Sequence, residues 1–140
     1  MTAEGLTIIL AEDDDGHAAL IRRSLERARL QARVMQFRSS RELLDYFARP
    51  DRPPSMLVLL DIRLSGGDGI EALQQLKSRP ETQAVPVYVL TGEDNRRQVD
   101  VCFALGCNVF VPIPTDYSEF MASMQRLCQL LEVSRFPGQA

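Results

Sequence analysis

The chain has 140 residues, of which 45% are hydrophobic and 25% are charged, and its formal net charge is −3. These values are typical of one soluble domain with a single core, and we treat residues 1–140 as one domain with a short tail at about 133–140. The acidic balance gives no electrostatic basis for nucleic-acid binding, and no apolar run approaches the length of a membrane span. The three cysteines lack zinc-site or disulfide-framework spacing, so we expect reduced thiols in a cytoplasmic protein.

Short apolar runs alternate with helical patterns along the chain. In chain order, the expected strands are residues 6–10, 32–37, 56–60, 85–90 and 108–111. Because most of these runs are apolar throughout, they indicate strands buried on both faces, as in parallel sheets. Apolar residues recur at helical spacing between the runs, first at Ala18, Ile21, Leu25 and Ala28 and last at Phe120, Met124, Leu127 and Leu131. The pattern predicts an α/β fold, a doubly wound parallel sheet with five strands and five helices.

Aspartates stand where several of these helices should begin. Asp14 or Asp15 precedes the first helical pattern, and Asp68 and Asp116 precede two later ones. Aspartate is a preferred N-cap residue because its side chain accepts a hydrogen bond from a free backbone N–H of the first turn. We therefore expect N-caps at these positions.

Polar residues follow three of the expected strands. Glu12 and Asp13 follow the first, Asp61 follows the third, and Thr91 follows the fourth. In a doubly wound sheet the carboxyl ends of the strands share the edge where ligands bind. Clustered carboxylates raise one another's pKa, and a hard cation such as Mg²⁺ relieves that repulsion. Each signal alone is weak, but their joint placement predicts a metal and phosphoryl site, with Asp61 as the nucleophile and Thr91 as a hydroxyl donor.

Three stretches resemble one known family. "IILAEDDDGHAALI", "LVLLDIRLSGGDGIEAL" and "VPVYVLTGEDN" are similar to the receiver domain of two-component response regulators, over nearly the whole chain from Leu6 to about Glu132. The resemblance implies a flavodoxin-like sheet with strand order 2-1-3-4-5. It also implies that Asp61 accepts a phosphoryl group from a phosphohistidine on a sensor histidine kinase, so that the protein is a phosphoacceptor and not an enzyme acting on a separate substrate.

The same resemblance implies roles for further residues. Asp13 and Asp61 would bind Mg²⁺ together with the backbone carbonyl of Arg63, and Glu12 would assist through water. Thr91 would move toward the phosphoryl group, and Phe110 would occupy the aromatic switch position on the fifth strand. "EDDDGHAALIRRSLERA", "CFALGCNVFV" and "DYSEF" are similar to single-domain regulators that accompany phytochrome-type histidine kinases, which implies such a kinase as partner and no output domain.

The stretch "GCNVFVPIPTDY" departs from the family pattern. Receivers end their fifth strand in Lys-Pro, and alignment on Pro114 places Ile113 at the lysine position. Residues 106–124 contain no basic side chain that could replace the lysine. A charge-assisted hydrogen bond contributes roughly 1.5–3 kcal/mol, so we expect weaker phosphoryl binding and a switch that is largely uncoupled from phosphorylation. The family's Lys-Pro bond is commonly cis, so we also expect a cis Ile113–Pro114 bond.

Two functional classes remain open on these grounds. One is a phosphoacceptor with altered switching, and the other is a pseudo-receiver that binds partners without phosphorylation. The intact Glu12, Asp13, Asp61 and Thr91 favour the first, because a pure binding module does not need clustered carboxylates. A haloacid-dehalogenase-like phosphatase is disfavoured, because it would need a second acid where this chain has Arg63.

The last helix carries more apolar residues than one buried stripe requires, with Met121, Cys128 and Leu130 as the surplus. A thick core helix would explain them, but we favour a partly exposed face that forms a homodimer or contacts a kinase. Phe136 in the tail would extend this face. The sequence does not identify the kinase or the downstream target.

Overall fold

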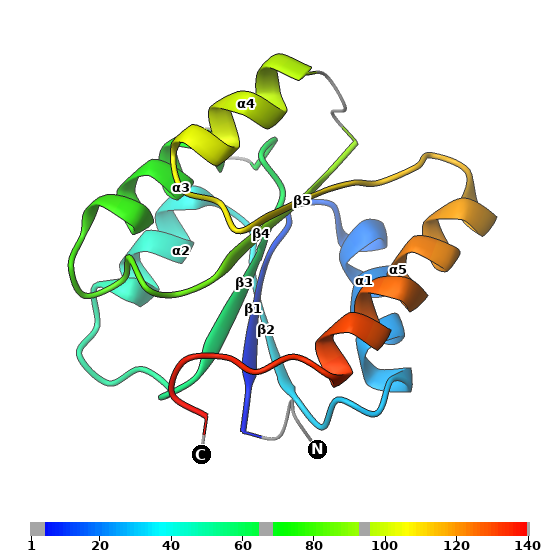
Figure 1. Cartoon of the computed structure of the whole chain (residues 1–140), viewed down its shortest axis with the longest axis horizontal. Helices are drawn as coiled ribbons and strands as arrows, with labels where there is room; N and C mark the ends of the chain where they lie inside the picture. Colours follow the sequence, from blue (N-terminus) through cyan, green and yellow to red (C-terminus); the bar gives the residue numbers. More distant parts are fainter. Residues whose placement is uncertain (1–4, 65–68, 93–95, 140) are drawn as a thin grey trace.

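Strands and helices alternate along the computed structural model, which describes residues 5–64, 69–92 and 96–139 (Figure 1). The strands are β1 (Thr7–Ala11), β2 (Arg33–Phe37), β3 (Met56–Leu60), β4 (Val87–Thr91) and β5 (Val109–Pro112). The helices are α1 (Asp15–Arg27), α2 (Ser40–Phe47), α3 (Gly69–Ser78), α4 (Arg96–Ala104) and α5 (Tyr117–Glu132). No helix in the described ranges combines the length and the apolar character needed to cross a membrane.

All the strands pair in parallel in one sheet, in the order β2-β1-β3-β4-β5. This confirms both the doubly wound α/β class and the flavodoxin-like order. β5 is an edge strand, which explains how it can include Pro112, a residue without an N–H to donate to a neighbouring strand.

The sheet separates two apolar layers. On one side α1 and α5 pack together, and on the other lie α2, α3 and α4 (Figure 1). Alternation along a single strand supplies both layers: Ile8 and Leu10 of β1 face the first layer, and Ile9 and Ala11 face the second. The strand is therefore apolar throughout because both of its faces are covered.

Two of the predicted helix caps are confirmed. Asp14 Oδ1 accepts a hydrogen bond of 3.0 Å from the backbone N–H of His17 and begins α1. Asp116 Oδ2 accepts one of 2.9 Å from the backbone N–H of Glu119 and begins α5. Asp68 lies outside the described residues.

The predicted cis bond is wrong, since every peptide bond in the described ranges is trans, including Ile113–Pro114. The trans isomer of an X–Pro bond is intrinsically favoured by about 0.5–1 kcal/mol. The expected cis geometry accompanies a lysine in the family. Here the Ile113 side chain instead packs in the apolar layer beneath α1 and α5, where only 5% of the residue is exposed.

The prediction that Phe136 extends an exposed face is also wrong. The tail folds back on the molecule, and Phe136 is buried in the layer beneath α1 and α5 with 6% exposure. Gly138 makes this path possible: its φ is +86°, and a Cβ there would lie 1.9 Å from the Pro54 carbonyl oxygen, just before β3. Of the surplus residues of α5, Cys128 is buried, Met121 is half-buried and Leu130 is exposed.

Replacing Phe136 with alanine should lower the free energy of unfolding by about 3 kcal/mol, because it empties a buried aromatic site. Urea denaturation measures the change. The matched control is Val133→Ala in the same tail, where the residue is 74% exposed and the expected change is below about 0.5 kcal/mol. Equal effects of the two substitutions would show that the tail does not pack as described.

Candidate functional site

The site is built on the register between β1 and β3. Ala11 is paired with Leu60, so the next residue of each strand, Glu12 and Asp61, leaves the sheet at the same level. The backbone N–H of Asp61 donates to the Ala11 carbonyl at 3.0 Å, and that of Glu12 donates to the Phe37 carbonyl at 3.0 Å. As a result, carboxylate oxygens of Glu12, Asp13 and Asp61 lie within 4.8 Å of one another.

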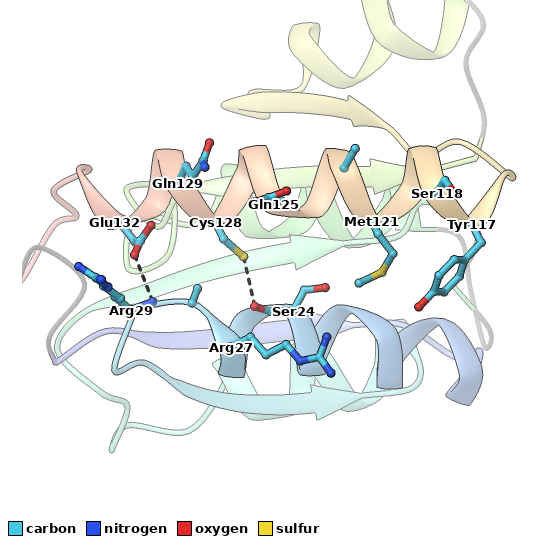
Figure 2. Close-up of a pocket in the computed structure, with 12 residues that line it drawn as sticks. Ser24, Arg27, Arg29, Tyr117, Ser118, Met121, Gln125, Cys128, Gln129 and Glu132 are labelled. Atoms are coloured by element: carbon cyan, nitrogen blue, oxygen red, sulfur yellow. Dashed lines mark hydrogen bonds between the residues drawn. The ribbon is translucent and has the colours of Figure 1, made fainter.

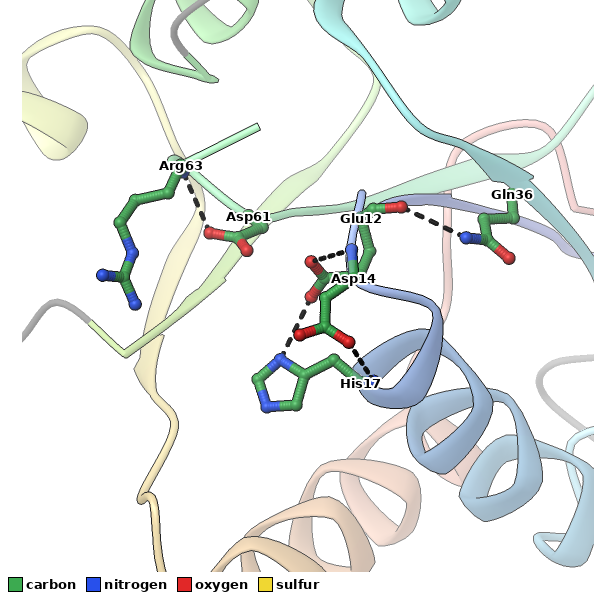
Figure 3. Close-up of polar contacts among 6 residues, drawn as sticks. All are labelled: Glu12, Asp14, His17, Gln36, Asp61 and Arg63. Atoms are coloured by element: carbon green, nitrogen blue, oxygen red, sulfur yellow. Dashed lines mark hydrogen bonds and ion pairs between the residues drawn. The ribbon is translucent and has the colours of Figure 1, made fainter. Parts of the chain in front are cut away.

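Glu12 is the most buried of these acids, with 3% exposure (Figure 3). Its carboxylate accepts a hydrogen bond of 3.3 Å from the Asp14 backbone N–H and lies 3.2 Å from Nδ1 of His17. Burial, the largest cause, and the nearby Asp61 carboxylate together raise the pKa of Glu12 to about 8. Without a cation, the cluster therefore holds a proton that an ordinary glutamate would lose.

These residues fit a hard divalent cation. Three carboxylates offer oxygen ligands to one point, which is the donor set that Mg²⁺ prefers. The pKa of Glu12 is raised by burial and, to a smaller extent, by repulsion from Asp61, and a bound cation would remove that repulsion. Asp61 and Asp13 are half-buried, so the cluster is open on one side.

Thr91 and Gly92 lie at the end of the neighbouring strand. β3 pairs with β4 so that Leu60 is opposite Val89, which places the end of β4 next to Asp61. Thr91 is buried with 2% exposure, and its carbonyl accepts a hydrogen bond of 2.7 Å from the Ile113 N–H. The predicted nucleophile and the predicted hydroxyl donor therefore follow adjacent strands at the same edge of the sheet.

The positions expected for the lysine and the switch lie on the last strand and just beyond it. Ile113 packs toward α1 and α5 in the apolar layer, and its correspondence to the lysine stays a prediction. Phe110 is half-buried and packs against the opposite apolar layer, the one on the side of α2, α3 and α4. Its role as a switch stays a prediction, as does the metal contact of the Arg63 carbonyl.

Sequence analysis missed two residues that hold Glu12. His17 contacts its carboxylate, and the His17 ring also stacks on Phe120 with ring centroids 5.1 Å apart. Gln36 of β2 donates a hydrogen bond of 3.1 Å from Nε2 to the Glu12 carbonyl (Figure 3). The Gln36 contact has no local sequence signal, because only the folded sheet brings β2 beside the end of β1. The His17 contact is local, since His17 lies in the first turn of α1, just after Glu12 in the chain.

Gly69, the first residue of α3, lies directly against the backbone that carries Asp61. A Cβ on Gly69 would lie 2.5 Å from the Ile62 Cα and 2.6 Å from the Asp61 carbonyl oxygen. Gly69 thus lets α3 begin directly against the backbone that carries Asp61. The sequence shows a glycine at the start of an expected helix. The structure shows why a glycine is needed there: the backbone of α3 lies too close to the backbone of Ile62 for a side chain to fit.

Residues 8–125 match the family model described as the response regulator receiver domain. The chain belongs to this family. The receiver domain of Rhodospirillum rubrum is similar in structure: it has 32% identity and a TM-score of 0.89, with 95% of this chain and 98% of that chain covered. A curated relative, the probable methanogenesis regulatory protein FilR2 of Methanothrix harundinacea, is 31% identical, with 95% of this chain and 88% of that protein covered.

Phytochrome-associated receivers are also among the similar structures. The phosphorylated cyanobacterial phytochrome response regulator RcpA has 25% identity and a TM-score of 0.84, with 94% of this chain and 97% of that chain covered. The receiver described here spans between 23% and 88% of the length of its curated relatives. Some of those relatives therefore carry long segments that have no counterpart here.

The raised pKa of Glu12 should make the metal-free receiver less stable as the pH rises. Unfolded Glu12 loses its proton near 4.5, and folded Glu12 loses it near 8, so the free energy of unfolding should fall across that window. Asp61→Asn removes one cause of the shift and leaves burial, the larger one, in place. The decrease in the free energy of unfolding between about pH 5.5 and pH 8.5 should therefore be smaller by about 1 kcal/mol in this variant than in wild type.

Urea denaturation in the presence of a chelator measures this difference. Asp51→Asn is the matched control, because Asp51 is exposed and the pKa of its carboxyl is lowered by Arg49, so its titration lies below the window. If Asp61→Asn and wild type show the same dependence on pH, the coupling between the two carboxylates is refuted.

Proposed function

We propose that this receiver accepts a phosphoryl group on Asp61 from a phosphohistidine of a sensor histidine kinase. The observation that supports this most directly is the convergence of three carboxylates within 4.8 Å beside Thr91, at one edge of the sheet. A module that only bound partners would not need to bury Glu12 next to Asp61, since that arrangement costs stability. The protein would thus act as a phosphoacceptor.

Each residue at the site has a defined task in this proposal. A carboxylate oxygen of Asp61 attacks phosphorus, and the backbone N–H of Arg63, 2.9 Å from Asp61 Oδ1, holds the carboxylate in orientation. The Thr91 hydroxyl donates a hydrogen bond to a transferred oxygen. Glu12, Asp13 and Asp61 would hold Mg²⁺, which when bound neutralises charge on the phosphoryl oxygens.

We further propose that the phosphodonor is a phytochrome-type kinase. Support comes from the similarity to the phytochrome response regulator RcpA over nearly the full length of both chains. The stretches at residues 12–28, 102–111 and 116–120 carry the same resemblance in the sequence.

Asp61 should be labelled by a small phosphodonor such as phosphoramidate only when Mg²⁺ is present. Intact-protein mass spectrometry at neutral pH measures the acyl phosphate. Asp61→Asn should abolish labelling, because the amide is not a nucleophile toward phosphorus. Asp51→Asn, an exposed acid away from the cluster, is the control and should be labelled like wild type. Labelling that survives in Asp61→Asn would refute the assignment.

Phosphorylation should have only a small effect on the end of β5. In receivers with the lysine, the ammonium links the phosphoryl group to this strand. Here Ile113 presents an alkyl chain that is packed in the apolar layer. A ligand shifts an equilibrium only through contacts that differ between the two states. We therefore expect phosphate to change self-association by less than about tenfold, which is 1.4 kcal/mol.

A homodimer through the face that contains α5 remains part of the proposal. Leu130 is 48% exposed, and Tyr117, at the start of the same helix, is also exposed. Tyr117 lines the groove between α5 and α1, whereas Leu130 does not, so Leu130 is the candidate centre of the contact, where interfaces are most apolar. Because Phe136 and Cys128 are buried, the face is narrower than the sequence suggested.

Sedimentation velocity should show dimers at micromolar concentration, and Leu130→Glu should weaken the dimer by at least about tenfold. The matched control is Gln129→Glu, which adds the same charge on the adjacent residue, one of those around the groove between α5 and α1 that Figure 2 draws. Only monomers at high concentration, or equal effects of both variants, would contradict this interface.

A further inference from the structure

The predicted phosphoryl site lacks a lysine, and the one lysine of the chain is held elsewhere by other contacts. Lys77 is the only lysine in the sequence. Its Nζ donates to the carbonyls of Val85 and Gln83 at 2.7 and 3.1 Å, and it lies 3.2 Å from Asn108 Oδ1. These partners precede β4 and β5, so Lys77 is held at the amino edge of the sheet, opposite Asp61. Apart from Mg²⁺, the permanently charged group that could bind the phosphoryl group is therefore an arginine.

Arg63 brings a guanidinium to the correct edge. Its backbone N–H binds the Asp61 carboxylate, and Figure 3 shows its side chain on the opposite side of that carboxylate from Glu12 and His17. A Cβ added to Gly92 would lie only 3.1 Å from Arg63 Nη2, and no other heavy atom outside residues 91–93 lies within 4 Å of it in the described structure. The guanidinium thus lies over the backbone that directly follows Thr91.

We propose that the Arg63 guanidinium takes over the task of the missing lysine and binds the phosphoryl group on Asp61. The inference rests on the proposed phosphoacceptor function. Asp61 and Gly92 follow adjacent strands, and a phosphoryl group on Asp61 that reaches the Thr91 hydroxyl must lie between them. The backbone N–H of Arg63 binds Asp61 on one side of that space, and its guanidinium lies beside Gly92 on the other. A guanidinium is always charged and presents several N–H donors in a plane that matches two phosphoryl oxygens.

The transfer step balances with this assignment. An Asp61 carboxylate oxygen forms a bond to phosphorus while the bond from phosphorus to the donor nitrogen breaks. The leaving nitrogen keeps the electron pair and takes a proton from solvent. Arg63 exchanges no proton, and its charge opposes the negative charge carried by the phosphoryl oxygens throughout the step.

Arg63→Ala should therefore weaken binding of beryllofluoride, a phosphoryl mimic, by about ten- to a hundredfold in the presence of Mg²⁺. The rate of labelling by phosphoramidate should fall in the same proportion. Arg63 is exposed and its backbone is unchanged by the substitution, so the variant should fold and keep its main-chain contacts. Arg63→Lys should retain part of the affinity, because it keeps the charge but loses the planar donor set. Fluorine NMR titration measures the affinities.

Gly92→Ala tests the position of the charge without removing it. The added methyl group would lie 3.1 Å from Nη2, so the tip of the arginine must move away. Beryllofluoride affinity should fall, by less than in Arg63→Ala. In the Arg63→Ala background, Gly92→Ala should have no further effect on affinity, because the side chain that it displaces is absent.

Arg135→Ala is the matched control, since it removes the same charge from the exposed tail that follows α5, at the opposite edge of the sheet. The affinity of Arg135→Ala for beryllofluoride should equal that of wild type. Ile113→Lys in the Arg63→Ala background should restore affinity if the double variant folds, as checked by circular dichroism. If the double variant does not fold, the test relies on Arg63→Lys and on the comparison of Gly92→Ala in the wild-type and Arg63→Ala backgrounds.

The outcomes separate the two proposals. If wild type binds beryllofluoride and Asp61→Asn does not, the phosphoacceptor function stands. Arg63→Ala that then binds like wild type would overturn the role of Arg63 alone. Equal losses in Arg63→Ala and Arg135→Ala would also overturn it, because the effect would be one of net charge. If wild type binds no beryllofluoride and is not labelled, the proposed function fails and the role of Arg63 fails with it.

Discussion

The register of β1 against β3 is the constraint on which the rest of this receiver depends. Side chains alternate between the two faces of a strand. A slip of one residue would therefore move every side chain of β1 from the apolar layer on one face of the sheet to the layer on the other face. The same slip would move Glu12 by one residue along the strand relative to Asp61. Packing of apolar side chains far from the site therefore fixes the separation of the carboxylates that do the chemistry.

The electrostatics of the site oppose the stability of the fold. Glu12 is buried beside another acid, and within the described structure its compensating contacts include a backbone N–H and the ring of His17. An arrangement that is unfavourable in the empty protein becomes favourable once a cation is bound, so the fold and the ligand are energetically linked. Natural sequences commonly break local rules of this kind at the sites that carry function.

Features with a local cause could be predicted from the sequence, and features with a distant cause could not. The strands followed from apolar runs, and the caps at Asp14 and Asp116 followed from one side chain next to one helix start. The burial of Phe136 could not be predicted, because it depends on a glycine turn that seats the tail against Pro54. The position of the Arg63 guanidinium was missed for the same reason. No residue near Ile113 in the sequence points to Arg63, because its guanidinium lies beside Gly92 only across the edge of the folded sheet.

The packing of Ile113 also bears on how the strand end moves. Its N–H is bonded to the Thr91 carbonyl at 2.7 Å, and its side chain lies in the apolar layer beneath α1 and α5. Strand ends usually fray, because their amides open locally without disturbing the core. In this receiver, opening the carboxyl end of β5 would pull an apolar side chain out of that layer. The Ile113 amide should therefore exchange with solvent only in the large-scale openings that expose the core. The carboxyl end of β5 would then open together with the core and not separately from it.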